Sequence, residues 1–550
     1  MGDEKDRSAY AGRWVARLRG RIIAQGGTPE LARRAALSAR HKESPEIIYM
    51  PVELTFSPLV DQVRAVLPDQ EIYLVGGAVR DMLLGRVSHD LDFTVPADAI
   101  PLARKVANAF GADYVTLDEE HDTGRAIHTA EDGTRTCLDF ASFRGKTLED
   151  DLRDRDFTIN ALAYDLREGA ILDPLEGAVD LRAKRIRACS PTSLSEDPIR
   201  VLRGIRQAAA FGFQIDKSTR EWMKQAAPLL GRASVERQRD ELFKILDGPK
   251  PDASIRALEM LGVLPHFLPE LTALKGVEQS APHIHDVWSH TLSVLQSLED
   301  ILSALAVGYS ADATNDLYTG LLTLRIGRYR EQIARHFDTP LNTDRSVRGL
   351  LFLAVLYHDV RKPQTRTVEE SGRVRFFDHD EQGAQVAAER ALAFHLSNDE
   401  VNRLRVVIKN HMRFHFHTSR MEGEGKSPSR RSIYRFFRES GPAGVELVLL
   451  GLADLRGTQG PNLKQESWTA ALDVARILLE NYFEKPEETI APPRLVDGHD
   501  LMSALDLKPG PVVGDVLEAI REAQATGKVS TREEALAFGK AWLEEQHNSS

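Results

Sequence analysis

The stretch Ile72–Val95, IYLVGGAVRDMLLGRVSHDLDFTV, decides the expected fold of the first part of the chain. An apolar run ends at Gly76 and Gly77, and a short helical pattern follows. The next segment, HDLDF, has the character of a strand and holds Asp90 and Asp92. Because the side chains of a strand alternate between its two faces, both aspartates are predicted on the same face.

Two neighbouring carboxylates repel each other and resist burial unless a cation lies between them. Mg²⁺, a hard ion that takes oxygen ligands, fits such a pair and suits phosphoryl transfer. Gly76 and Gly77 allow a tight turn whose amides can face a phosphate, at the start of a helix that favours anions. These features predict a nucleoside triphosphate site with magnesium. Taken alone, however, a glycine pair and a DLD string favour an ordinary surface strand.

The order of the motifs changes this interpretation, because it resembles the nucleotidyltransferase head of the class II tRNA nucleotidyltransferase and poly(A) polymerase family. The resemblance extends from about residue 70 to 540. It implies an α+β fold, in which a small mixed-sheet head precedes an all-α neck and body and an all-α HD domain. It also implies that Asp90 and Asp92 are catalytic metal ligands. The GGxVRD…DxD signature is present at Gly76, Gly77, Val79, Arg80, Asp81, Asp90 and Asp92, and the resemblance assigns nucleotide binding to Gly76, Gly77 and Arg80.

A second segment, DLRDRDFTINALAY at 151–164, resembles the family element that contacts the ribose. Arg155, Asp156 and Asn160 match this element, whereas Asp154 stands where the family usually has a second arginine. The alternative for Arg155 and Asp156 is a role in a buried structural ion pair. The following DPLEGAVDL matches the family element that joins head and neck, so Asp173, Gly177 and Asp180 are expected to be structural or hinge-like.

The segment SEDPIR resembles the family's EDxxR motif and predicts the base-reading residues Asp197 and Arg200. Three residues apart, they share a helix face if Pro198 lies in the first turn. An aspartate accepts from the amino group that cytosine and adenine present, and an arginine donates to the ring nitrogen beside it. Guanine and uracil present the opposite order. The resemblance therefore implies selection of CTP and ATP without a nucleic-acid template; the alternative is a capping acid followed by a surface arginine.

The helical third quarter of the chain is rich in histidine and resembles the HD superfamily of metal-dependent phosphohydrolases. Imidazoles with carboxylates suit a divalent transition metal such as Ni²⁺, Mn²⁺ or Co²⁺, and two ions could share Asp359. Arg361 replaces the usual glycine of the HDxGKP element, so metal binding is a firmer expectation than hydrolysis. The ligands that the resemblance implies are His290, His358, Asp359, His379, His411 and Asp454.

The bulk properties are those of a cytoplasmic protein with several domains. The 550 residues carry a formal net charge of −11, which argues against a protein that coats nucleic acid over its whole surface but allows a local basic groove. Two cysteines cannot form a disulfide framework, and the apolar runs are too short for a membrane helix. Residues 13–42 are rich in arginine, and a solvated helical extension is expected there.

The expected domains are an N-terminal extension at 1–50, the head at 51–188 and a helical, nucleobase- and RNA-binding neck at 189–275. The HD domain is expected at 276–482 and a helical tail at 483–550. The resemblance implies addition of C, A or both from CTP and ATP to tRNA 3′ ends, with neither membrane nor DNA as partner. Only a few residues separate Phe143 from Glu149, where complete CCA-adding relatives often carry a longer loop, and this favours a partial, CC-adding enzyme. Alternatives are a poly(A) polymerase and an HD phosphohydrolase with an RNA-binding head.

Overall fold

The computed structural model describes residues 10–38, 43–52, 54, 56–309, 316–342 and 345–549. The chain forms two compact units, which divide between Ala233 and Ser234. This division falls inside the stretch 189–275 that the sequence suggested as one neck. None of the described helices combines the length and apolarity that crossing a lipid bilayer requires.

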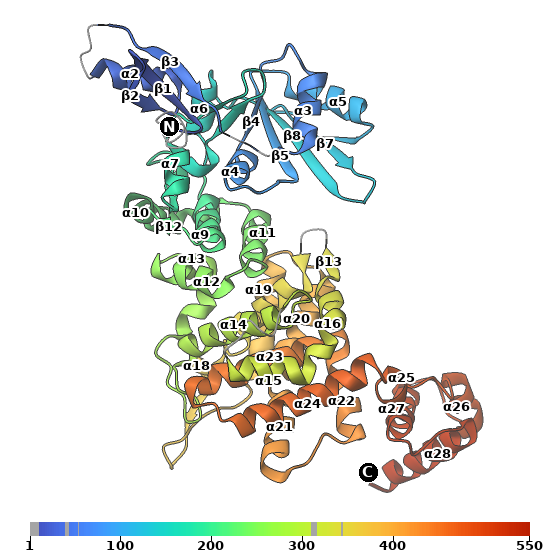
Figure 1. The fold of residues 1–550 in the computed structure, drawn as a ribbon. Coiled ribbons are helices and arrows are strands. Elements are labelled where there is room, and N and C mark those ends of the chain that lie inside the picture. Colours follow the sequence, from blue (N-terminus) through green and yellow to red (C-terminus); the bar gives the residue numbers. More distant parts are fainter. Residues whose placement is uncertain are drawn as a thin grey trace. The chain divides into compact units, whose positions relative to one another are not determined.

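The head of the first unit is a seven-stranded sheet in the order β10-β9-β4-β5-β8-β7-β6 (Figure 1). Strand β5 pairs in parallel with β8, and the other pairs of strands are antiparallel. The expected mixed sheet is therefore confirmed. The strands are β4 (Tyr73–Val75), β5 (Asp90–Val95), β6 (Asp113–Asp118), β7 (Thr123–Thr129), β8 (Arg135–Ser142), β9 (Ala163–Asp165) and β10 (Ala170–Leu172).

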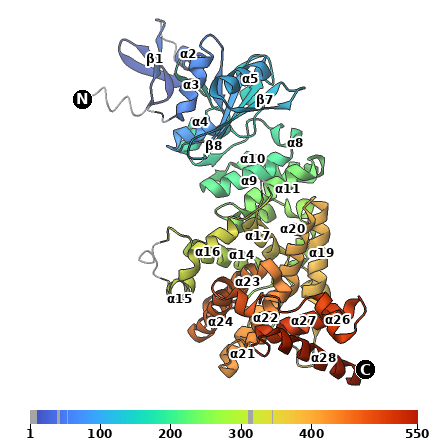
Figure 2. The same ribbon diagram turned by 90° about the vertical axis from the view of Figure 1, so that its right-hand side faces the viewer.

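Helices cover this sheet and continue beyond it. The helix α5 (Ala99–Phe110) packs on β7 (Figure 2) and on β8. Its buried alanines join Phe93 and Phe140 in the head core. Small side chains on this helix face allow it to lie close to the strands. The remaining elements of the unit are α3 (Pro58–Val66), α4 (Gly77–Leu83), α6 (Leu148–Arg153), α7 (Gly177–Arg182), β11 (Arg185–Ile186), α8 (Ser193–Glu196), α9 (Ile199–Phe211), β12 (Gln214–Ile215) and α10 (Lys217–Ala226).

For the described part of residues 1–50, the prediction of a solvated helical extension is wrong. Strands β1 (Arg13–Leu18), β2 (Arg21–Gly26) and β3 (Glu46–Met50) form an antiparallel sheet in the order β2-β1-β3, and α2 (Pro29–Ser38) packs on it. Arg19 and Gly20 both take positive φ, 48° and 81°, as a tight hairpin turn between two twisted strands requires. Short apolar runs on both sides of a glycine turn therefore outweigh the arginine-rich composition.

This small sheet is joined to the head through the turn after β10. Arg13 Nη2 lies 2.6 Å from Glu176 Oε2 and Arg13 Nη1 lies 3.5 Å from Asp173 Oδ2. Asp173 also donates its amide to the Gly27 carbonyl at 2.8 Å. Burial raises the pKa of Asp173 to about 6, although the Ala178 and Gly177 amides and Arg13 favour its charged form. The DPLEG turn therefore has the expected structural role, and its partner is the N-terminal sheet, which the sequence did not suggest.

The second unit is almost entirely helical, and buried aliphatic side chains cover its two central helices nearly all round. These are α17 (Val347–Tyr357) and α23 (Gly444–Gln459). The other helices of its body are α11 (Val235–Leu246), α12 (Pro251–Met260), α13 (Leu264–Phe267), α14 (Val287–Ala304), α15 (Leu317–Ile326), α16 (Arg330–Phe337), α18 (Lys362–Thr365), α19 (His379–Ala393), α20 (Asn398–Asn410), α21 (Met412–Glu424), α22 (Arg430–Ser440), α24 (Gln465–Phe483) and α25 (Pro486–Thr489).

Two short hairpins and a small C-terminal cluster complete the second unit. The hairpins are β13–β14 (Pro340–Asn342 and Arg345–Ser346) and β15–β16 (Arg366–Val368 and Val374–Phe376). The C-terminal helices α26 (Gly498–Leu505), α27 (Pro511–Ala525) and α28 (Arg532–Ser549) bury a core of their own.

Candidate functional sites

The two aspartates of the DLD string lie on one face of β5, as the alternation of a strand requires. The side chain of Leu91 between them is 3% exposed and belongs to the core, whereas Asp90 is exposed and Asp92 is half-buried. In the described part of the chain, the carboxylates of Asp90 and Asp92 make no hydrogen bond or ion pair. Burial raises the pKa of Asp92, Arg155 opposes this rise, and the charges of Asp139 and Asp90 add to it. This donor set fits a divalent cation, whose charge would offset both the cost of burying the Asp92 carboxylate and its repulsion by Asp90 and Asp139.

Asp139 faces Asp92 across the parallel pair β5–β8. Both its oxygens accept hydrogen bonds at 2.7 Å from Arg125, one from Nε and one from Nη2. A carboxylate held in this bidentate way already has its counter-charge. The structure therefore keeps Asp139 apart from the two unpaired carboxylates of the DLD string.

Gly76 has a different role from the one that its position suggested. Its amide donates to the Leu162 carbonyl at 3.2 Å, so it is not presented to a phosphate. The residue instead has φ +74° and ψ −136°, and a Cβ on it would lie 3.1 Å from Arg155 Nη1 and 3.2 Å from Asp92 Oδ2. Glycine is needed here because the chain reverses tightly against two charged side chains. Gly77 is the first residue of α4.

Three residues predicted to bind nucleotide are linked into one hydrogen-bonded network. Arg80 Nη1 donates to Asn160 Oδ1 at 2.7 Å, and Asn160 Nδ2 donates to Asp156 Oδ1 at 3.0 Å. Arg80 also forms a bidentate pair with Asp81 and stacks over the Phe211 ring. The network fixes the positions of these side chains beside the glycine turn.

Arg155 and Asp156 each enter an ion pair, but with different partners. Arg155 donates to Asp151 Oδ2 at 3.0 Å, and Asp156 Oδ2 lies 2.9 Å from Arg203 Nε. Burial opposes the ionisation of Asp156, but Arg203, Asn160 and the Phe157 amide hold its pKa below the usual range. Arg203 was missed in the sequence, although it follows Arg200 by one helical turn.

Asp197 and Arg200 lie side by side at the start of α9. Arg200 Nε is 3.7 Å from Asp197 Oδ2, and its Nη1 donates to the carbonyls of Ser193 and Arg155 at 3.3 and 3.4 Å. Pro198 is the cap residue that precedes the helix, one position earlier than expected. The link from Arg200 to Arg155 ties this pair to the segment that carries the ribose-contacting candidates.

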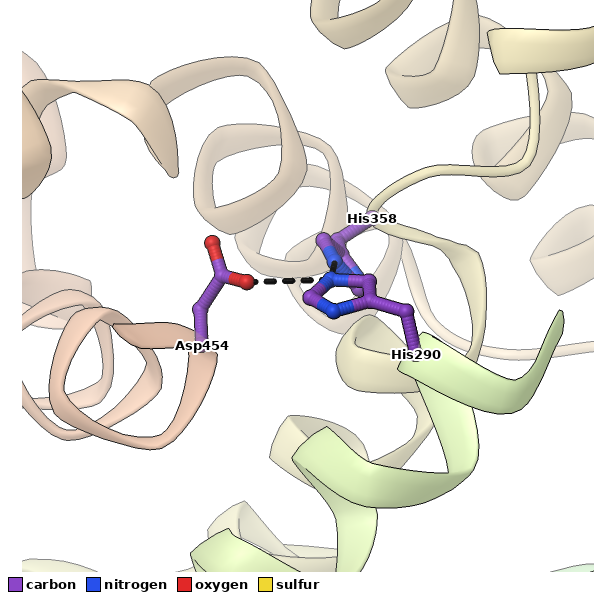
Figure 3. A group of neighbouring side chains, drawn as sticks. All are labelled: His290, His358 and Asp454. Carbon is purple, nitrogen blue, oxygen red and sulfur yellow. Dashed lines mark hydrogen bonds and ion pairs between the residues drawn. The ribbon is translucent and has the colours of Figure 1, made fainter. Parts of the chain in front are cut away.

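The second unit brings all six predicted ligands together in its interior. One group comprises His290, His358 and Asp454, and the other Asp359, His379 and His411; within each group the possible ligand atoms lie within 4.8 Å of one another. Figure 3 shows that the first group converges from three separate elements, with His290 Nε2 3.0 Å from Asp454 Oδ1. All six side chains are buried.

Asp359 lies between the two groups, as the sequence suggested. Its Oδ2 is 3.1 Å from His358 Nε2, and its Oδ1 is 3.5 Å from His379 Nε2. Burial opposes ionisation, but His358 and Lys362 hold the pKa of Asp359 well below its usual value, and Lys362 Nζ lies 2.7 Å from Oδ2. This geometry suits a carboxylate that bridges two metal ions.

The histidines are oriented by backbone carbonyls. His358, His379 and His411 each direct Nδ1 to the carbonyl three residues earlier, at 2.7, 2.8 and 2.6 Å. If Nδ1 carries the proton, Nε2 is left to bind a metal at the centre. Burial, together with His379 and His358, lowers the pKa of His411 to about 3, which keeps it neutral. His415 was missed in the sequence: its Nε2 lies 2.6 Å from Asp454 Oδ2.

Comparisons with known proteins find family matches in the head, in the segment that follows it and in the C-terminal tail. Residues 72–187 match the poly A polymerase head domain, 212–275 a probable RNA- and SrmB-binding site of polymerase A, and 493–538 the putative domain 2 of tRNA nucleotidyltransferases. The A-adding tRNA nucleotidyltransferase of Deinococcus radiodurans is 34% identical over 86% of this chain and 96% of its own length. The CC-adding enzyme of Thermus thermophilus is 31% identical over 86% and 94%. A CCA-adding enzyme solved with CTP shares the fold, with a TM-score of 0.56 at 22% identity over 89% of this chain and 96% of the other.

Proposed function

The chain belongs to the tRNA nucleotidyltransferase family, and on this basis we propose that it adds cytidylate residues to the 3′ end of tRNA. The observation that carries the proposal is the position of Asp92 beside the turn at Gly76, with Asp90 on the same face of β5 and neither carboxylate paired in the described part of the chain. Addition of nucleotides to tRNA 3′ ends is common to the two full-length relatives, although their names differ in the nucleotide added.

The choice of cytidylate rests on the connection after β8. Only residues 143–147 separate β8 from α6, and Thr147 closes this turn with a capping box to Asp150. A five-residue turn that is anchored at both ends, by the Arg144 amide on Asp151 and the Thr147 amide on Asp150, has little free length with which to move between two base-selection states. This supports CC addition over the complete CCA sequence.

In the proposed reaction, the 3′-hydroxyl of tRNA attacks the α-phosphate of CTP and pyrophosphate leaves. Enzymes of this family use a divalent metal, and we propose that Asp90 and Asp92 hold Mg²⁺, which would favour the hydroxyl's ionisation and neutralise the leaving group. Asp197 and Arg200 are proposed to pair with the base edge. The wrong base leaves these half-buried groups unpaired at a cost of roughly 1–3 kcal/mol each.

The decisive experiment uses purified protein and three tRNAs that end before, within and after CCA, with CTP and ATP supplied separately and together. Two additions from CTP to the tRNA that lacks CCA, and none from ATP, would support the proposal. Addition of A to a tRNA that ends in CC would identify an A-adding or complete enzyme, and long A tails on any RNA a poly(A) polymerase.

A second activity is favoured by the position of Asp359 between two histidine groups. We propose that the second unit holds two divalent transition-metal ions, such as Ni²⁺, Mn²⁺ or Co²⁺, and hydrolyses phosphate esters. Bound metals would supply a water of lowered pKa and would polarise the phosphate. Hydrolysis of a 2′,3′-cyclic nucleotide in the presence of each ion tests this activity. No hydrolysis with any of the three ions would leave a structural centre only.

A further inference from the structure

The helix α9 contacts the candidate nucleotide residues of the head with one side chain from each of its turns. Side chains three and four residues apart lie on the same face of a helix. Those of α9 that hold a head residue are Arg200, Arg203, Gln207 and Phe211, and their respective partners are Arg155, Asp156, Asn160 and Arg80. The sequence suggested a role for the first of the four, and none for Gln207 or Phe211.

Gln207 fixes the orientation of the Asn160 side-chain amide. It is 3% exposed, and its Oε1 accepts a hydrogen bond from Asn160 Nδ2 at 3.1 Å. The same nitrogen donates to Asp156 Oδ1 at 3.0 Å, so both N–H groups of the Asn160 amide are used within the protein. The amide oxygen Oδ1 is thereby directed at Arg80, whose Nη1 donates to it at 2.7 Å.

Phe211 contacts the same guanidinium through its ring. Arg80 Cζ lies over this ring, 4.7 Å from its centre, and Asp81 accepts from Nε and Nη2 of Arg80, both at 2.9 Å. Three of the five N–H groups of the guanidinium are thus engaged, and two are left for a ligand. An arginine that is already held in place binds an anion without first losing the freedom of a long side chain.

We propose that Gln207 and Phe211 are positioning residues for the triphosphate of the nucleotide. Gln207 acts through Asn160 and Phe211 through its ring, and together they direct the two free N–H groups of Arg80 at phosphate oxygens. The inference rests on the proposed nucleotide site of the head, in which Arg80 binds phosphate. It assigns Asn160 to the support of Arg80, because a ribose hydroxyl finds no free N–H donor on this amide.

The test measures the affinity of the full-length protein for CTP and, by displacement, for cytidine, in isothermal titrations with Mg²⁺ and without tRNA. Gln207→Met keeps the length of the side chain and removes the acceptor, whereas Phe211→Leu keeps an apolar side chain and removes the ring. Each variant should bind CTP about 3- to 10-fold more weakly, as expected for the loss of one hydrogen bond or one cation–π contact. The affinity for cytidine, which has no phosphate, should be unchanged.

A second set of titrations shows whether both residues act through Arg80. In a protein that carries Arg80→Ala, Gln207→Met and Phe211→Leu should change the affinity for CTP by less than about 2-fold, because the residue that they position is gone. The matched controls are Gln225→Met on the exposed surface of α10 and Phe213→Leu. The Phe213 ring lies 5.5 Å from that of Phe211 but contacts no guanidinium in the described part of the chain, and neither control should change the affinity for CTP.

The outcomes distinguish the positioning role from the proposed function. Unchanged affinity for CTP in both variants, equal weakening of CTP and cytidine, or the same loss in the absence of the Arg80 side chain would overturn the positioning role. A loss in only one variant would reject the role of the other residue. A wild-type protein that binds CTP but extends no tRNA would contradict the proposed function and leave the positioning role standing.

Discussion

Asp92 and Asp139 are paired residues on the neighbouring parallel strands β5 and β8, yet only Asp139 is neutralised within the protein. Arg125 donates to both oxygens of Asp139, while the carboxylate of Asp92 has no such partner in the described part of the chain. The sheet thus places two like charges side by side, and the carboxylate of Asp92 is the one that is available to the cation proposed above.

Asp92→Asn should lower nucleotide addition at least about 1,000-fold, because a metal ligand that acts in the transition state is lost. Asp139→Asn is the matched control: it lies on the adjacent strand and should retain most of the activity. Single-turnover incorporation of CTP into tRNA measures both. The assignment fails if Asp139→Asn is as inactive as Asp92→Asn, or if Asp92→Asn stays active.

Gly76→Ala should lower addition about 100-fold, because the new methyl group pushes Arg155 or Asp92 by a few tenths of an ångström from its position in the site. Gly85→Ala provides the control, since Gly85 also has positive φ, +70°, but a methyl group added to it would have no atom within 4 Å. That variant should lose about 1–2 kcal/mol of stability through backbone strain and keep its turnover rate. An equal loss of turnover in both variants would show that backbone strain, and not crowding of the site, causes the loss in Gly76→Ala.

Arg200→Ala and Asp197→Ala should change base choice more than triphosphate affinity, because the pair faces the base edge in the proposed function. Incorporation of all four ribonucleotides measures the preference, and Arg220→Ala on the exposed surface of α10 serves as the control. We expect discrimination against uridylate and guanylate to fall about 10- to 100-fold. An unchanged preference in both variants would reject the base-reading role.

Arg13→Gln should lower the free energy of opening of the N-terminal sheet by about 3 kcal/mol at pH 8 and by less at pH 5. The folded pKa of Asp173, about 6, lies above its ordinary value of 3.8, so the stability that its protonated form contributes is lost as pH rises through 6. Removal of Arg13 raises this pKa further and leaves a buried charge only at the higher pH. Hydrogen exchange of β1 amides, corrected for the intrinsic rate, measures the effect, and Arg17→Gln is the control. Equal loosening at both pH values would contradict this linkage.

Asp359→Asn should reduce the metal content of Mn²⁺-reconstituted protein from about two ions per chain to one or none, because the bridging ligand is lost. The control is Asp378→Asn, whose exposed residue has φ +57°, a conformation that asparagine tolerates. Elemental analysis after gel filtration gives the content. Nucleotide addition should be unchanged, since the two sites use separate ligands; a folded Asp359→Asn protein that cannot extend tRNA would show instead that the units are coupled.

The sequence alone determined the features that depend on local periodicity and on chemistry within a short segment. Alternation along HDLDF places Asp90 and Asp92 on one face of β5, and Gly76 in the preceding segment makes the turn. The spacing of Asp197 and Arg200 likewise brings them together. In each case neighbouring residues fix the geometry, because the backbone of one strand or one helix turn determines which side chains are adjacent.

Only the tertiary structure decided which distant side chains are partners. Arg155 and Asp156 are adjacent in sequence, yet they pair with Asp151 and Arg203 because the folded chain brings α9 against the buried carboxylate. The contact between Arg13 and Asp173 joins residues 160 positions apart, and it turns an arginine-rich segment into a structural part of the head. A buried charge must be paired wherever the chain places it, and its partner therefore follows from packing rather than from sequence distance.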